Sequence, residues 1–200
     1  MLPAVRVFLG ALGDVYYELF LLVGVNLLWL VGMITIIPAV PATAAVFYLT
    51  SQMVKGESID FGTFFRGFRN YFAQSWLLFA VSQLISLVIL ANVVFYINMD
   101  SELLRLIGIL WAYAMVFWLC VQMYTFPLLI EQGSRGIFRV LRNAVLLTLD
   151  NLVFTLTLLV ILVLFVALSS VLVIVIPLLL ACIVATAQNK AALLLLEKYR

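Results

Sequence analysis

The sequence predicts an all-α, polytopic helical membrane protein, with about six membrane segments arranged as three hairpins and with amphipathic helices lying in the membrane surface. Three observations predict this fold class. Hydrophobic residues make up 67% of the 200 residues and charged residues 10%, against roughly 45–50% and about 25% in soluble domains. Long apolar runs recur along the chain, and most basic residues fall between them. We therefore treat residues 1–200 as a single integral membrane domain.

The first expected hairpin begins with the apolar run 19–37, which is close to the length of about 20 residues that crosses a bilayer. Pro38 and Pro41 follow it and favour a turn. The next apolar run, residues 42–54, is short and would measure about 20 Å as a helix. We expect it either to return across the membrane as a short tilted helix or to be re-entrant.

The other two expected hairpins are formed by four apolar runs, residues 74–97, 103–130, 152–176 and 178–196. Pro177 separates the last two runs. One continuous helix over residues 152–196 would be about 68 Å long, more than twice the thickness of the hydrocarbon core. A hairpin near Pro177 is therefore the better prediction.

The basic residues predict the orientation, because short cytoplasmic loops carry an excess of Lys and Arg. An inside amino terminus places ten of the eleven basic residues in the cytoplasm: Arg6; Lys55, Arg66 and Arg69; Arg135, Arg139 and Arg142; and Lys190, Lys198 and Arg200. Arg105 alone falls near the other side, close to Asp100 and Glu102. Both termini are thus expected to be cytoplasmic.

Two cytoplasmic connections share the pattern F-R-x-[F/L]-R-N, at residues 65–70 and 138–143. We expect helices over about 60–72 and 134–148 that lie in the membrane surface, with arginines toward lipid phosphate. Their expected membrane faces are Phe61, Phe64, Phe65, Phe68 and Phe72 in the first, and Ile137, Phe138, Leu141 and Val145 in the second. The residues expected to contact lipid or a partner are Arg66, Arg69, Arg135, Arg139 and Arg142.

Residues 3–17, with Arg6 and Asp14, resemble these two segments more weakly. With this third copy, the chain would consist of three units, each a surface helix followed by a membrane hairpin. The alternative is that connections between membrane segments commonly acquire arginines and interfacial aromatic residues without any repeat.

The residue types present exclude several classes of catalytic and metal-binding site. The chain has no His and only two Cys, Cys120 and Cys182, so His-based metal sites and Ser/His/Asp or Cys/His catalysis are excluded. We expect no catalytic, cofactor-binding or metal-ligating residue and no enzymatic activity. A net charge of +2 gives no general affinity for nucleic acid.

Charges and polar groups near the membrane are few. Glu18, Asp150 and Lys190 lie toward the expected cytoplasmic edge, where charged side chains reach water or pair with one another. Within the apolar segments, Asn26, Thr43 and Gln83 are the candidate polar site. The alternative role for such residues is hydrogen bonding between helices, worth roughly 0.6 to 2 kcal/mol.

The first 75 or so residues resemble a known family. The run Asn26-Leu27-Leu28-Trp29, then Pro38-Ala39-Val40-Pro41-Ala42-Thr43-Ala44-Ala45, and then the basic, Phe-rich segment 64–69 is similar to the YesL-like family of small bacterial integral membrane proteins. The function of that family is uncharacterised, so no catalytic residues carry over. The resemblance implies the bacterial cytoplasmic (inner) membrane and an association with carbohydrate uptake.

Together these features favour an accessory or scaffolding integral membrane protein that associates with a solute uptake system. The alternative is a small oligomeric transporter or channel for a neutral solute or lipid. The expected partners are membrane lipids, with anionic headgroups preferred, and other membrane protein subunits, but no nucleic acid. No cofactor is expected.

Overall fold

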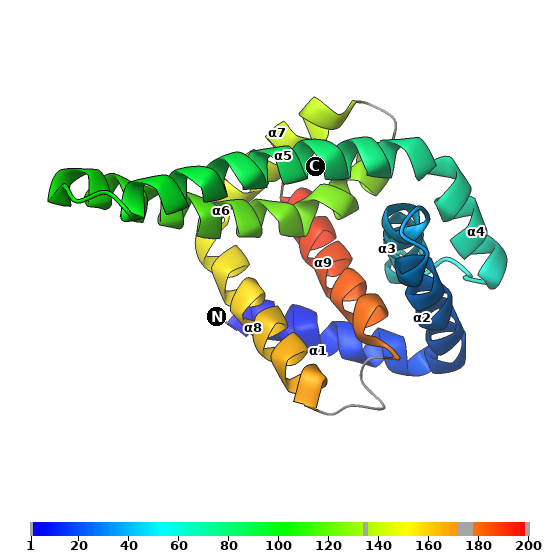
Figure 1. Ribbon diagram of the computed structural model, residues 1–200. Helices are drawn as coiled ribbons and strands as arrows, with labels where there is room; N and C mark the ends of the chain where they lie inside the picture. Colours follow the sequence, from blue (N-terminus) through cyan, green and yellow to red (C-terminus); the bar gives the residue numbers. More distant parts are fainter. Residues whose placement is uncertain (1, 134–135, 172–177, 199–200) are drawn as a thin grey trace.

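The computed structural model describes residues 2–133, 136–171 and 178–198, which form helices joined by short turns (Figure 1). In order, these are α1 (Leu2–Tyr17), α2 (Leu19–Ile34), α3 (Ala39–Val54), α4 (Phe61–Asn70), α5 (Phe72–Ile97), α6 (Glu102–Gln132), α7 (Ile137–Asp150), α8 (Leu152–Val171) and α9 (Leu180–Glu197). These ranges contain no strand. The all-α class is confirmed.

Four of the described helices, α5, α6, α8 and α9, are long and apolar enough to cross a membrane. The helices α1 and α2 meet that criterion only as a pair, and they are bent by 98° at their junction. The helix α3 is apolar but has only 16 residues. The structure therefore supports a multi-pass membrane protein with four or five candidate spans, whereas the sequence predicts six segments.

The turn between α2 and α3 differs from the prediction in its boundaries. The helix α2 ends at Ile34, and α3 begins at Ala39, so Pro41 lies in the first turn of α3 rather than before it. Proline fits there because the first N–H groups of a helix have no intrahelical partner. The chain reverses through Ile36, whose φ of 59° lies in the left-handed region.

The described helices fall into three units of three, which we call unit I (α1–α3), unit II (α4–α6) and unit III (α7–α9). Each unit begins with a short helix, then breaks at a single residue and continues into two apolar helices. The break residues are Glu18, Tyr71 and Asn151. The described chain thus contains three times the order of one helix, a one-residue break and two apolar helices, with α1–α3 as the first copy.

The three units pack in a closed ring. The last helix of each unit packs on the first helix of the next unit: α3 on α4, α6 on α7, and α9 on α1. The same last helices also pack on one another in all three combinations, α3 with α6, α6 with α9, and α3 with α9. They therefore form a central three-helix core, with α2, α5 and α8 around it (Figure 1).

Unit II departs from the other two units in length. Its hairpin of α5 and α6 has helices of 26 and 31 residues, and its far half extends beyond all the other helices (Figure 1). The two helices approach closely at Gly108, where an added Cβ would lie 2.8 Å from a side-chain carbon of Ile97. The hairpin is thus closely packed along a segment that no other described unit covers.

Unit III has the loosest hairpin. The helices α8 and α9 make little contact with each other, and an apolar pocket of about 400 Å³ lies between them and α6. The expected turn at Pro177 and the end of the predicted segment 152–176 lie outside the described residues. The described part of this segment ends at position 171.

Candidate functional site

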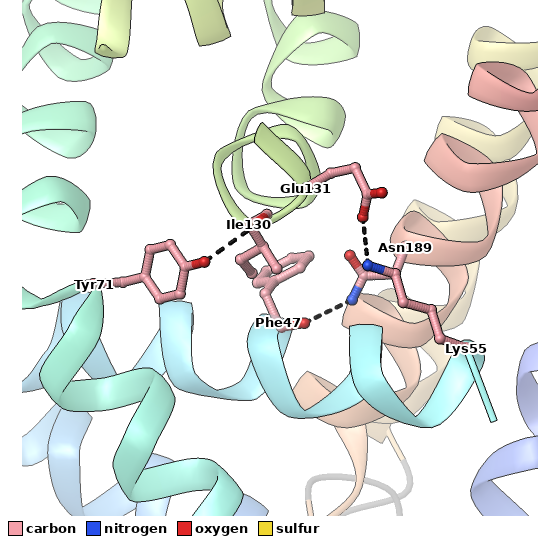
Figure 2. Close-up of polar contacts among 6 residues, drawn as sticks. All are labelled: Phe47, Lys55, Tyr71, Ile130, Glu131 and Asn189. Carbon is pink, nitrogen blue, oxygen red and sulfur yellow. Dashed lines mark hydrogen bonds and ion pairs between the residues drawn. The ribbon is translucent and has the colours of Figure 1, made fainter. Parts of the chain in front are cut away.

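Polar contacts join the three central helices (Figure 2). The Asn189 side chain of α9 is buried, and its Nδ2 donates to the Phe47 carbonyl oxygen and to the Thr50 hydroxyl oxygen of α3, each at 2.8 Å. The Phe47 ring stacks on Phe126 of α6, with ring centroids 5.2 Å apart. Asn189 and Phe47 therefore connect all three central helices.

The ion pair of Lys55 and Glu131 lies next to this junction (Figure 2). Lys55 Nζ, at the end of α3, is 2.6 Å from Glu131 Oε2 on α6, and the side chains are 32% and 18% exposed. Nearby, the Tyr71 hydroxyl donates to the Ile130 carbonyl oxygen at 3.4 Å. Burial raises the pKa of Tyr71, so the hydroxyl remains a donor at neutral pH.

A pocket of about 380 Å³ borders this ion pair. Lys55, Glu131 and Glu197 are its charged lining residues, and Val54, Leu193 and Leu196 complete the lining. The pocket lies where the carboxyl-terminal parts of α3, α6 and α9 meet. It is therefore a partly polar cavity at one end of the central core.

A second ion pair closes the ring between units III and I. Lys190 Nζ of α9 lies 2.7 Å from Asp14 Oδ2 of α1, with both side chains partly exposed. The same ammonium lies directly over Gly10, where an added Cβ would be 3.1 Å from it. Lys190, which the sequence places near the membrane edge, is thus paired within the protein.

The candidate polar residues have separate partners. Asn26 is fully buried, and its Oδ1 accepts from the main-chain N–H of Ala181 at 3.1 Å. Thr43 donates to the Ala39 carbonyl and accepts from Trp29 Nε1, each at 3.0 Å. Gln83 lies on the exposed side of α5. No hydrogen bond between described residues joins any two of the three.

Acidic and thiol side chains are scattered over the described ranges. These residues contain no group of three or more His, Cys, Asp or Glu that could hold a metal ion. Cys120 and Cys182 are both free and buried. Cys182 Sγ lies 3.6 Å from the Leu22 carbonyl oxygen, as a weak hydrogen bond between α9 and α2.

The first predicted surface helix, α4, begins with a side-chain cap. Asp60 Oδ1 accepts from the main-chain N–H of Thr63 at 2.7 Å and from its hydroxyl at 2.6 Å. The Thr63 hydroxyl, its main-chain N–H and the Arg66 guanidinium lower the pKa of Asp60. Arg66 is held beside the cap through Thr63. The cap fixes the start of the helix one residue after Asp60.

The expected membrane face of α4 is wrong in part. Phe64 is only 3% exposed, whereas Phe61 and Phe65 are 48% and 58% exposed. The buried side of α4 packs on α3, where Gly67 lies against Tyr48. The aromatic residues are therefore divided between the protein core and the outer surface.

The same division occurs in α7, where Ile137 and Leu141 are buried but Phe138 is 81% exposed. Like α4, α7 packs on the last helix of the preceding unit. Each helix thus has three faces, one on the protein, one apolar and exposed, and one basic. The sequence pattern separates apolar from basic positions only. It therefore does not distinguish the apolar face that packs on the protein from the apolar face that is exposed.

Arg66, Arg69, Arg139 and Arg142 lie at exposed positions of α4 and α7. Arg69, Arg139 and Arg142 form no hydrogen bond or ion pair with other described residues. Arg66 is also exposed, but it lies 3.8 Å from the carboxylate of its neighbour Asp60. Arg135 lies outside the described residues. Arg69, Arg139 and Arg142 are thus available to bind an anionic group.

The sequence pattern does not single out Asn189 or the pair of Lys55 and Glu131. One signal could have identified two of the three helices that carry them, α3 and α9. The tripeptide Ala-Thr-Ala occurs at residues 42–44 and again at 185–187, in α3 and α9. Small residues allow helices to approach closely in a membrane, and the alanines of both tripeptides are buried in the core.

Comparison with known proteins adds one result. No curated protein and no solved structure matches the chain. Residues 22–93, which run from α2 to most of α5, match the family described as "Protein of unknown function, DUF624". The matched part includes α3, α4 and the Asp60 cap, and over this range the chain is similar to an uncharacterised family.

Proposed function

We propose that this protein is an accessory or scaffolding subunit that docks beside a larger complex in the bacterial inner membrane, a solute uptake system of the kind that the resemblance to YesL-like proteins implies. The observation that carries the proposal is the hairpin of α5 and α6. Its far half extends beyond the ring (Figure 1). Exposed apolar side chains line both helices there, including Val94, Phe95, Leu106 and Leu110. Such side chains can pack on lipid or on the apolar helices of another membrane protein, and we assign this protruding surface to the second.

The polar groups of the core support the same proposal. A transporter needs polar groups along a shared cavity, whereas Asn26, Thr43 and Asn189 are all engaged in hydrogen bonds within the protein. The alternative of a small transporter or channel for a neutral solute or lipid is favoured by one observation, the pocket at the Lys55–Glu131 pair. A solute path through this pocket would require the carboxyl-terminal ends of the central helices to move apart.

The proposed topology has six membrane segments and both termini in the cytoplasm. It follows from the placement of ten of the eleven basic residues. In this topology α4 and α7 lie at the inner surface, and Arg66, Arg69, Arg139 and Arg142, with Arg135, contact anionic lipid. Each such contact contributes about 1 kcal/mol and weakens as salt is added.

Site-specific photo-crosslinking in native membranes tests the docking surface. A crosslinker at Leu110 should capture a discrete membrane protein. A crosslinker at Val160, which is similarly exposed but lies on α8, should capture mainly lipid. Equal products from both positions would contradict docking through the hairpin.

Reconstitution in liposomes tests the alternative. The purified protein should show no saturable uptake of neutral sugars or lipids. Saturable uptake by the pure protein would instead support the transporter.

A further inference from the structure

A pocket of about 400 Å³ lies between α1, α3 and α9, beside the joint where unit III meets unit I. Arg6, Lys190 and Glu197 are its charged lining residues, and Val7, Leu193 and Leu194 form apolar walls. Its volume falls within the range typical of small-molecule sites. The pocket combines charged groups with an apolar surface, as the binding site of an amphiphile must.

The charged residues of this pocket differ in their partners. Lys190 is paired with Asp14. Arg6 and Glu197 have opposite charges and line the same pocket, but they do not pair with each other. Neither forms a hydrogen bond or an ion pair with any other described residue. Among the described residues, the pocket therefore presents one exposed cation and one exposed anion without an ion-pair partner. Glu197 also lines the neighbouring pocket at the Lys55–Glu131 pair.

We propose that this pocket binds the headgroup of a zwitterionic phospholipid of the phosphoethanolamine type, with the phosphate on Arg6 and the ammonium on Glu197. Guanidinium binds phosphate through paired N–H donors. The Glu197 carboxylate accepts hydrogen bonds from a primary ammonium. Lys190 has three N–H donors, and its contact with Asp14 leaves others for the phosphate.

The position of α1 favours a membrane lipid, rather than a free small molecule, as the ligand that carries the phosphoethanolamine group. The helix meets α2 at 98°, so it lies along the membrane surface if α2 crosses the membrane. Val5 and Leu9 of α1 and Leu194 of α9 are exposed apolar residues on the two helices that flank the pocket. Acyl chains can lie against these side chains while the headgroup occupies the pocket, as at other interfacial helices.

The two unmatched charges also predict selectivity. Phosphatidylglycerol has the phosphate but no ammonium, so it would leave Glu197 facing an anionic ligand. Phosphatidylcholine carries a positive charge without N–H donors, so it cannot donate hydrogen bonds to Glu197. Phosphatidylethanolamine satisfies both residues and should be preferred to either lipid.

Native mass spectrometry of the full chain tests this site. The purified protein in detergent is offered an equimolar mixture of phosphatidylethanolamine, phosphatidylcholine and phosphatidylglycerol with identical acyl chains. The wild-type protein should retain phosphatidylethanolamine about tenfold more than phosphatidylglycerol, which corresponds to about 1.4 kcal/mol. Glu197→Gln should abolish this preference but still bind both lipids. Arg6→Gln should lower retention of all three about tenfold.

Arg105→Gln, at the far turn of the α5–α6 hairpin, is the matched control and should bind like the wild type. Helical content is checked for each variant by circular dichroism. Equal retention of phosphatidylethanolamine and phosphatidylglycerol by the wild type would overturn the proposal, as would Arg6→Gln and Glu197→Gln variants that behave like the control. Free phosphoethanolamine should not displace the bound lipid at equal concentration. Displacement at equal concentration would overturn the proposal that the ligand is a membrane lipid.

Discussion

Asn26, in the middle of α2, accepts a hydrogen bond from the main-chain N–H of Ala181 in the first turn of α9. The first N–H groups of a helix have no intrahelical partner, and Leu179, at the N-cap of α9, provides no side-chain cap. Asn26 therefore caps a helix that belongs to another unit. This contact links unit I to unit III inside the apolar core.

The Asn26→Leu variant should lose stability, by about 1–3 kcal/mol, because the partly buried Ala181 N–H would remain without its acceptor. Unfolding in detergent micelles, followed by circular dichroism, measures the effect. Asn92→Leu is the control, since the Asn92 amide donates only to Val88 of its own helix on an exposed face. Equal losses in the two variants would argue against the cap.

Gly67 should be required for the packing of α4 on α3. A Cβ at this position would lie 2.8 Å from Tyr48 Cβ and 3.1 Å from Ala45 Cα, so Gly67→Ala must separate the two helices. We expect a loss of about 1–3 kcal/mol. Gly13→Ala, where a Cβ would meet nothing within 4 Å, should be neutral or stabilising by up to about 1 kcal/mol. A stable Gly67→Ala protein would contradict this packing.

Ile36 should limit the stability of the turn between α2 and α3. Its φ of 59° costs a β-branched residue about 1–2 kcal/mol, and the side chain is exposed. Ile36→Gly removes this strain but adds entropy to the unfolded chain, so a net gain of up to about 1 kcal/mol is expected. Ile37→Gly, without positive φ at that position, should only lose stability. Thermal unfolding of both variants distinguishes these outcomes.

Asp60 should make the stability of α4 depend on pH. Its pKa in the folded protein is lowered from the ordinary value of 3.8. The charged cap therefore stabilises the fold above that value, and this contribution is lost as the pH falls through the lowered pKa. The Asp60→Asn variant should be less stable than the wild type near neutral pH, and the difference should shrink under acidic conditions. A constant difference at all pH values would be inconsistent with the charged cap.

Cysteine labelling in whole cells tests the proposed topology. Ser101→Cys, between α5 and α6, should react with an impermeant thiol reagent from outside. Ser58→Cys, between α3 and α4, should react only after the membrane is opened. Both serines are exposed, and the native Cys120 and Cys182 are fully buried, so background labelling should be low. The reverse pattern would invert the orientation.

The sequence predicts the course of individual helices better than their contacts. The run 74–97 is predominantly apolar, and its observed helix, Phe72–Ile97, begins two residues earlier. By contrast, the contact of Lys190 with Asp14 joins residues far apart in the chain, and no local pattern encodes it. Phe64 and Phe65 are neighbours with similar hydrophobicity, yet one is buried and the other exposed. Only the position of α3 decides which of them faces the protein.

The closed ring of units I, II and III implies that the chain tolerates circular permutation. Arg6, near the start of α1, and Glu197, at the end of α9, line the same pocket, so a short flexible linker can join these two ends. New termini opened at Gly56, in the exposed turn between α3 and α4, would give the order II, III, I. All the packing pairs between units would be kept, because α9 already contacts α1 in the same way that α3 contacts α4. The architecture therefore does not depend on which of the three units comes first along the chain.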